Sequence, residues 1–308
     1  MAGSTLAPTE TAIVQVSSTP TNTASMSASS TLAPTETVTV PASGAPTPTM
    51  SAIVTPAPTG TITPISPEHT LVPTTPVVTQ TPDVPLNGVE AHLEYADDDR
   101  TEISGVKNSE EATYVRIPER VTSIGQGAFE GCSNLTSIIL PENIETIGAF
   151  SFKNCKKIKS IMIPNKVEEI GGGAFEGCKG LESVMILDGV KELSIGDSVF
   201  AGCSNLTDIT LSKNLTSIGN CAFSECKKLK SIIIPGSLNV IPYGAFKDCE
   251  SLENVTILDG VQCIENTAFE NCTKLKKITI PNSVTSIESD AFAGYDIDVI
   301  WHGETEAW

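Results

Sequence analysis

Apolar residues recur along the chain with a period of about 23 residues, from residue 117 to residue 300. Phenylalanine marks this period most clearly. Its regularly spaced copies, separated by 23 or 25 residues, are Phe129, Phe152, Phe175, Phe200, Phe223, Phe246, Phe269 and Phe292. Cysteine follows three residues later in seven repeats, and Tyr295 takes that position in the eighth. A regular interval of this length predicts a protein built from stacked structural repeats.

Each repeat holds more apolar positions than one short element can bury alone. In the first repeat they are Val121, Ile124, Ala128, Phe129, Cys132, Leu135, Ile138 and Leu140. The alternation at Ile138 and Leu140 predicts a strand with both side chains pointing inward, and Val121 with Ile124 predicts a second extended segment on the opposite side of the coil. Stacking would bury these positions as columns in one continuous core. The sequence therefore predicts a β-rich solenoid of about eight 23-residue repeats, with parallel strands stacked coil on coil.

The repeated phrase carries a family resemblance. Residues 132–141 read Cys-x-x-Leu-x-x-Ile-x-Leu-Pro, and residues 121–129 read Val-x-x-Ile-Gly-x-x-Ala-Phe. This phrase resembles the leucine-rich repeat, and within it the BspA-like (Treponema-type) class, over residues 116–300. Two departures are local: the turn at 187–200 is two residues longer, and Tyr295 replaces cysteine. The resemblance implies a leucine-rich repeat solenoid and a role in surface adhesion.

Residues 1–85 have a different composition from the repeats. They contain 21 Thr, 10 Ser and 14 Pro, and no Lys, Arg, Cys, Phe, Tyr or Trp. Such a segment has too little apolar bulk to offset the entropy lost on ordering, and its prolines favour an extended chain. The composition is typical of O-glycosylated, mucin-like stalks. We expect a disordered stalk, and a plain disordered linker remains the alternative.

The segments that flank the repeat domain at 117–300 are predicted to cover its ends. Residues 86–116 would form an N-terminal cap, with a hairpin turn at Asp97 to Arg100. This acidic turn lacks the glycine and the distal glutamate of a calcium-binding EF-hand loop, so we interpret it as a solvated turn. Residues 301–308 form a tail, in which Trp301 is expected to cover the last coil.

The charge of the chain excludes some classes of partner. Asp and Glu number 37 against 19 Lys and Arg, giving a formal net charge of −18. Nucleic-acid binding depends on basic surfaces, so a nucleic-acid partner is not expected. No run of 18 apolar residues is present, so direct membrane insertion is not expected either. The first residues lack the basic and apolar regions of a secretory signal, which counts against an extracellular location.

The sequence offers little catalytic chemistry. The seven column cysteines are expected to be buried, packed thiols, since their spacing does not match the close Cys pairs of zinc sites. Cys221 and Cys263 lie outside the column. The three histidines, His69, His92 and His302, all lie outside the repeats, which leaves no base for a Ser or Cys nucleophile. We therefore predict no enzyme activity, no metal and no cofactor.

The predicted strands leave two outward-facing columns of residues. One column is Ile139, Met162, Met185, Thr210 and Ile233, and the column before it is Ser137, Ser160, Ser183 and Asp208. Contiguous exposed apolar residues mark interaction sites, and Met adapts to varied partners. The alternative is that these residues are simply good strand formers. We predict a binding face at these positions.

These observations favour a noncatalytic, protein-binding or adhesin-like repeat module, displayed at a cell surface or outside the cell on a mucin-like stalk. Its partner would be a protein or glycan ligand on a host or neighbouring cell. Two alternatives stay open: an accessory repeat domain of a larger secreted enzyme, and an intracellular scaffold.

Overall fold

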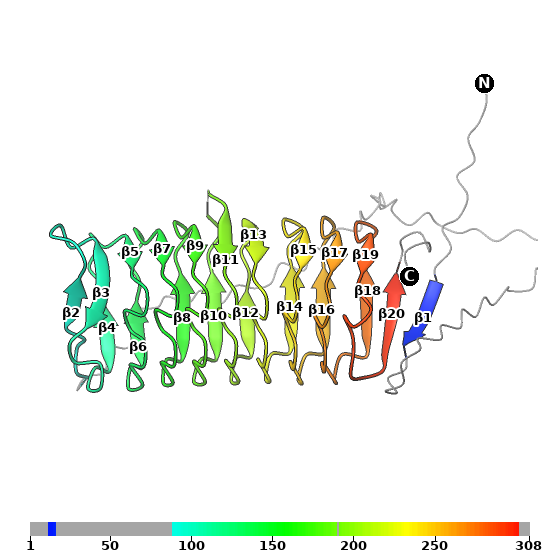
Figure 1. Cartoon of the computed structure of the whole chain (residues 1–308), viewed down its shortest axis with the longest axis horizontal. Coiled ribbons are helices and arrows are strands. Elements are labelled where there is room, and N and C mark those ends of the chain that lie inside the picture. Colours follow the sequence, from blue (N-terminus) through cyan, green and yellow to red (C-terminus); the bar gives the residue numbers. More distant parts are fainter. Residues whose placement is uncertain (1–11, 17–87, 190, 302–308) are drawn as a thin grey trace, which may run out of the picture. The chain divides into compact units, whose positions relative to one another are not determined.

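The computed structural model describes residues 12–16, 88–189 and 191–301. From residue 88 onward the strands form one β-solenoid of about nine turns, without a helix (Figure 1). Most coils contribute one strand to each of two rows, and the chain crosses between the rows through turns. The predicted leucine-rich repeat solenoid with parallel stacked strands is confirmed.

The first row contains the strands predicted from the alternation of Ile138 and Leu140. Its members are β4 (Tyr114–Arg116), β6 (Ser137–Ile139), β8 (Ser160–Ile163), β10 (Ser183–Ile186), β12 (Asp208–Thr210), β14 (Ser231–Ile234), β16 (Asn254–Ile257), β18 (Lys277–Ile280) and β20 (Ile297–Trp301). These strands pair in parallel, in three separate ladders: β4 with β6, β8 to β12, and β14 to β20. Equivalent residues of successive repeats lie opposite each other, as Met162 does with Met185.

The second row lies on the other side of the coil. Its members are β2 (Leu93–Tyr95), β3 (Glu102–Val106), β5 (Ser123–Ile124), β7 (Thr146–Ile147), β9 (Glu169–Ile170), β11 (Leu193–Ile195), β13 (Leu215–Ile218), β15 (Val240–Ile241), β17 (Cys263–Ile264) and β19 (Ser286–Ile287). From β3 onward these strands also pair in parallel. Most are two residues long, because turns occupy the remainder of that side.

The core between the rows is a continuous stack of phenylalanine rings. From Phe129 to Phe269 the column rings have no exposed surface, and Phe292 at the end is 6% exposed. Adjacent ring centroids lie 4.9 to 5.5 Å apart, and the rings are nearly parallel. This spacing lies within the range of favourable aromatic contacts. Each ring is therefore buried by the coils before and after it.

Glycine is favoured at two positions of the repeat phrase for different physical reasons. A Cβ on Gly125 would lie 2.7 Å from the carbonyl oxygen of Ile103 in the preceding coil, so this position needs a missing side chain. Gly127 instead has a φ of +65°, which favours glycine. The position equivalent to Gly127 is occupied in other coils by Phe150 and Cys221, at φ of +56° and +55°. The turn is thus conserved in shape although its residue changes.

The region predicted as an N-terminal cap takes part in both rows. β2 and β3 form an antiparallel hairpin, and β3 then pairs in parallel with β5. The hairpin turn predicted at Asp97 to Arg100 is confirmed: the Asp97 carboxylate accepts a hydrogen bond from the backbone nitrogen of Thr101 at 2.9 Å. Since β4 also pairs with β6, these residues build an additional coil before the eight repeats.

At the other end, Trp301 belongs to the last strand rather than to a tail. It is 5% exposed, and its indole nitrogen donates to the carbonyl oxygen of Val284 at 3.2 Å, so it covers the last coil as predicted. β1 (Ala12–Val16) pairs antiparallel with β20. Within 1–85, this strand departs from the expectation of a wholly disordered segment. The rest of that expectation, and residues 302–308, lie outside the described residues.

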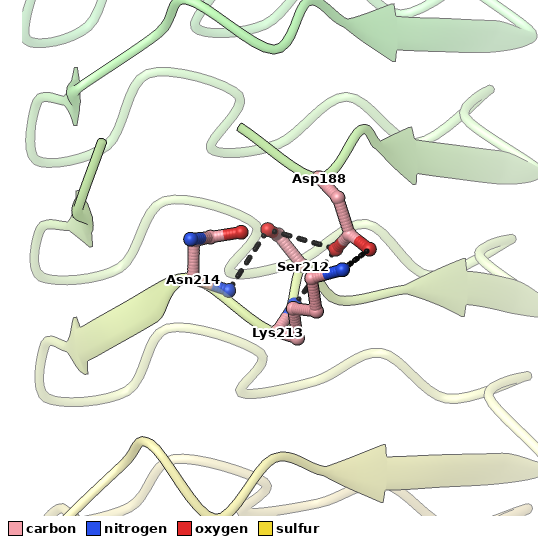
Figure 2. A network of polar contacts seen from close by, with 4 residues as sticks. All are labelled: Asp188, Ser212, Lys213 and Asn214. Atoms are coloured by element: carbon pink, nitrogen blue, oxygen red, sulfur yellow. Dashed lines mark hydrogen bonds and ion pairs between the residues drawn. The ribbon is translucent and has the colours of Figure 1, made fainter. Parts of the chain in front are cut away.

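A proline closely follows the first-row strand in four repeats, and Ser212 takes the equivalent place after β12. Figure 2 shows Ser212 with its hydrogen-bond partners. Ser212 is buried; its hydroxyl donates to Asp188 at 3.2 Å and accepts from the backbone nitrogen of Asn214 at 3.1 Å. Partial burial raises the pKa of Asp188, but hydrogen bonds from Lys213 and the charge of Lys213 outweigh it and hold the pKa below its ordinary value. Ser212 thus joins two successive coils.

We expect Phe175→Ala to lower the free energy of unfolding by about 3–5 kcal/mol, because it opens a cavity in the ring column. Phe150→Ala is the matched control: Phe150 is 37% exposed and lies outside the column, so its loss should stay within about 1 kcal/mol. Urea denaturation followed by circular dichroism measures both. Equal losses in the two variants would contradict the assignment of the column as the core.

A second pair of variants tests whether buried serine hydroxyls have hydrogen-bond partners. The Ser151 hydroxyl is buried without a hydrogen-bond partner, at a position where most repeats carry alanine. We expect Ser151→Ala to raise the free energy of unfolding by about 1 kcal/mol, and Ser212→Ala, which removes two hydrogen bonds, to lower it by about 1–2 kcal/mol. The same denaturation experiment decides; destabilisation by Ser151→Ala would show that the hydroxyl is satisfied.

Candidate binding surface

The structure brings the predicted face residues together on the outer side of the first row. Parallel register places Ser160, Ser183 and Asp208 in one line across β8, β10 and β12. The same register aligns Met162, Met185 and Thr210 in the neighbouring line. We call this surface, formed by the two outward columns of the first row, the strand face.

Exposure along the strand face is uneven. The side chains of Ile139, Met162 and Met185 are only partly exposed, as are the three predicted serines, Ser137, Ser160 and Ser183. Asp208 and Thr210 are exposed, and Ile233 is the most accessible apolar member at 56%. The apolar part of the face is therefore shallow near β6 to β10 and projects furthest at β14.

Both columns extend beyond the predicted residues. At the start, Tyr114 lies opposite Ser137 and Arg116 lies opposite Ile139. At the end, Asp298 and Ile300 continue the two lines from β18. The sequence contained a signal for the first extension, since Tyr114 to Pro118 ends in the same strand-then-proline pattern as the repeats. A cation and an aromatic ring thus flank the predicted face.

The column cysteines are packing residues. All nine cysteines are free, and the seven in the column are buried. The Cys155 thiol donates a hydrogen bond to the carbonyl oxygen of Phe129 in the preceding coil at 3.1 Å, and five later column cysteines repeat this contact. Burial raises the pKa of Cys132 to about 11 and that of Cys178 to about 12. These thiols stay protonated near neutral pH, so they are poor nucleophiles.

The remaining chemistry is sparse. Cys221 and Cys263 are partly exposed, and burial raises the pKa of both thiols. In residues 12–16, 88–189 and 191–301, no three His, Cys, Asp or Glu residues are grouped so that they could hold a metal ion. The same residues include no helix that could cross a bilayer.

The fold and its repeated phrase define a leucine-rich repeat β-solenoid. The family model described as "BspA type Leucine rich repeat region" matches residues 106–194 and 193–302 in six copies. The chain belongs to this family, which confirms the resemblance seen in its repeats.

Solved structures of other proteins are similar to the chain to different degrees. The chain is similar to a T. pallidum leucine-rich repeat protein, with 27% identity over 59% of this chain and 87% of that one, and a TM-score of 0.54. It is also similar to a leucine-rich cell surface protein of Faecalibacterium prausnitzii, with 20% identity over 63% and 80% of the two chains and a TM-score of 0.37. No curated protein matches the chain.

The thiol environments predict a simple reactivity pattern. In the native protein, a thiol reagent such as DTNB should modify Cys221 and Cys263 at pH 8 well before any column cysteine, because the column thiols are buried and protonated. All nine should react in denaturant. The Cys221→Ser, Cys263→Ser double variant should then show almost no rapid reaction. Rapid modification of a column cysteine in folded protein would contradict the packing described above.

Proposed function

We propose that this chain is a noncatalytic, adhesin-like binding module, and that the strand face receives a protein or glycan ligand on a host or neighbouring cell. The observation that carries the proposal is the alignment of two outward columns across successive parallel strands. Repeat proteins use such extended surfaces for binding. The columns combine small hydroxyl side chains with adaptable Met and Ile side chains, a mixture suited to a polar rim around an apolar contact.

Rigidity supports this role. The first-row strands are held by parallel backbone pairing within each of the three ladders and by the ring column behind them. A preformed surface loses little conformational entropy when a partner binds, which favours affinity. Thr210 interrupts the apolar line between Met185 and Ile233, which limits the size of the exposed apolar patch, and large exposed apolar patches promote aggregation.

Display at a cell surface is the second part of the proposal. The Thr, Ser and Pro content of residues 1–85 is suited to a mucin-like stalk that would hold the repeats away from an anchoring surface. Membership of a surface-protein-like family agrees with such a placement. The stalk would increase the distance between the repeats and the anchoring surface and would not itself contact the ligand.

An intracellular scaffold is the second candidate, because nine free cysteines are typical of a reducing compartment. Limited protease treatment of intact cells separates the two. Surface display predicts loss of the protein under treatment, whereas a scaffold would be untouched until the cells are lysed. An accessory role beside an enzyme domain would be revealed by a catalytic domain in the complete reading frame.

The binding role is tested with a triple variant, Ile139→Asp, Met162→Asp and Met185→Asp, in the full chain. We expect binding to cells and matrix proteins to fall at least about tenfold, since buried charge at an interface is costly. Ser217→Asp, Asn239→Asp and Ser286→Asp introduce the same charge at exposed positions of the second row or beside it, and should bind like the parent.

Circular dichroism and the melting temperature of each variant verify that the fold is retained. Equal binding by the parent and the strand-face variant would place the ligand elsewhere on the solenoid. Absence of binding by the parent across the panel would overturn the adhesin role.

A further inference from the structure

Lysines are concentrated at one edge of the solenoid. In seven repeats, four residues separate the column cysteine from the first-row strand, and these segments hold nine of the chain's 16 lysines. The nine are Lys156, Lys157, Lys159, Lys179, Lys227, Lys228, Lys230, Lys274 and Lys276. The same segments hold only three acidic residues, Glu182, Glu250 and Glu253, so their formal charge is +6 in a chain of −18. We call this surface the lysine edge.

The segments of the lysine edge stack on one another. The backbone nitrogen of Glu182 donates to the carbonyl oxygen of Lys159 at 2.8 Å, and that of Thr207 donates to the carbonyl oxygen of Glu182 at 2.9 Å. Each segment leads directly into a first-row strand, so the lysine edge borders the strand face. Equivalent side chains of neighbouring coils therefore form lines along the stack.

Most of this positive charge is unpaired. All three glutamates are engaged in ion pairs: Glu182 with Lys159, Glu250 with Lys227 and Glu253 with Lys274. Among the described residues, the other six lysines of the edge form no ion pair: Lys156, Lys157, Lys179, Lys228, Lys230 and Lys276. A surplus of this kind, within a strongly acidic protein, produces a local field that attracts anions.

A hollow of about 410 Å³ lies within the lysine edge, lined by residues of four successive repeats: Thr136, Lys156, Lys157, Lys159, Lys179, Gly180 and Asn205. The lack of a side chain at Gly180 explains why the hollow lies at this point of the lysine edge. A Cβ there would lie 2.3 Å from the carbonyl oxygen of Lys156, so the site requires a residue without a side chain, whereas the neighbouring repeats have Lys157 and Asn205 in this place.

Two lysines of the hollow already contact polar side chains of the same chain. Lys157 donates to the side-chain oxygen of Asn134 at 2.7 Å, and Lys159 pairs with Glu182 at 2.5 Å. Lys156 and Lys179 are exposed and have no ion-pair partner among the described residues. The ammonium groups of Lys156 and Lys179 are therefore available at the rim, and those of Lys157 and Lys159 already contact Asn134 and Glu182.

We propose that the lysine edge binds a linear anionic glycan, with the hollow between Thr136 and Asn205 as its main site. A lysine ammonium group is a point charge that can pair with a sulfate or uronate group in many orientations, whereas arginine, which the lysine edge lacks, binds a carboxylate in one fixed two-bond geometry. The lining has no aromatic side chain on which nucleic-acid bases could stack. Lysines recur further along the edge, so a polymer with a charge on each unit can make several contacts at once.

This site lies outside the strand face and does not depend on the proposed adhesin role of that face. The test uses the full chain with immobilised glycan probes: a sulfated glycosaminoglycan, an unsulfated uronate polymer, and neutral dextran. Lys156→Ala, Lys157→Ala and Lys179→Ala should weaken binding of the anionic glycan about tenfold or more, as expected for three surface charge contacts. Raising the salt concentration should weaken parent binding because exposed charges are screened.

The matched control is Lys107→Ala, Lys166→Ala and Lys213→Ala, which removes the same charge from exposed positions outside the lysine edge. It should stay within about twofold of the parent, because these lysines would not contact a glycan bound at the edge and distant surface charges are screened by salt. The strand-face variant should also retain glycan binding. Sulfated and uronate probes show which anionic group is preferred.

Four results would overturn the proposal. These are no parent binding to either anionic glycan, equal binding to neutral dextran, equal losses in the two lysine variants, and tighter binding of poly-glutamate or single-stranded DNA than of the glycans.

Discussion

Burial of one coil by the next is the constraint on which the whole structure depends. A single 23-residue coil has its ring, its thiol and its strand residues on a surface that only a neighbour can cover. The Phe column and the thiol-to-carbonyl hydrogen bonds both cross between coils, and so do the parallel backbone ladders. Because these contacts between coils all run along the stack, the side chains that face outward are free to vary. The strand face and the lysine edge are two such outward surfaces on one invariant interior.

The sequence predicted the interior well because the residues that form the interior recur at a regular spacing. The spacing of Phe175 and its equivalents required a stack, and the inward residues of each strand followed from alternation. The buried thiols followed from their place in the same period. The additional coil before residue 117 was less visible, since Tyr114 to Pro118 preserve only the strand half of the phrase. Hairpin pairing of β2 with β3 then supplies the other half.

The outer surfaces were harder to predict because exposure depends on neighbouring coils. Alternation indicated that Met162 and Met185 point outward, but it could not indicate that they are only partly exposed while Ile233 projects. A whole-chain charge of −18 likewise concealed a basic edge, because a sum over the sequence removes the information on where charges lie. In the sequence, Gly180 looks like an ordinary variation between repeats. The structure shows that the carbonyl oxygen of Lys156 leaves no room for a side chain at this position.

The ring spacing of about 5 Å between coils has a mechanical consequence. Each coil adds only that distance along the stack, yet it stores 23 residues, which extend to roughly 75–80 Å when pulled straight. A solenoid tethered at both ends and placed under load would therefore lengthen in large, nearly equal increments as terminal coils detach. Single-molecule stretching would record these increments as a regular series of steps. A repeat domain of this kind can serve as an extensible spring in the linkage between two surfaces.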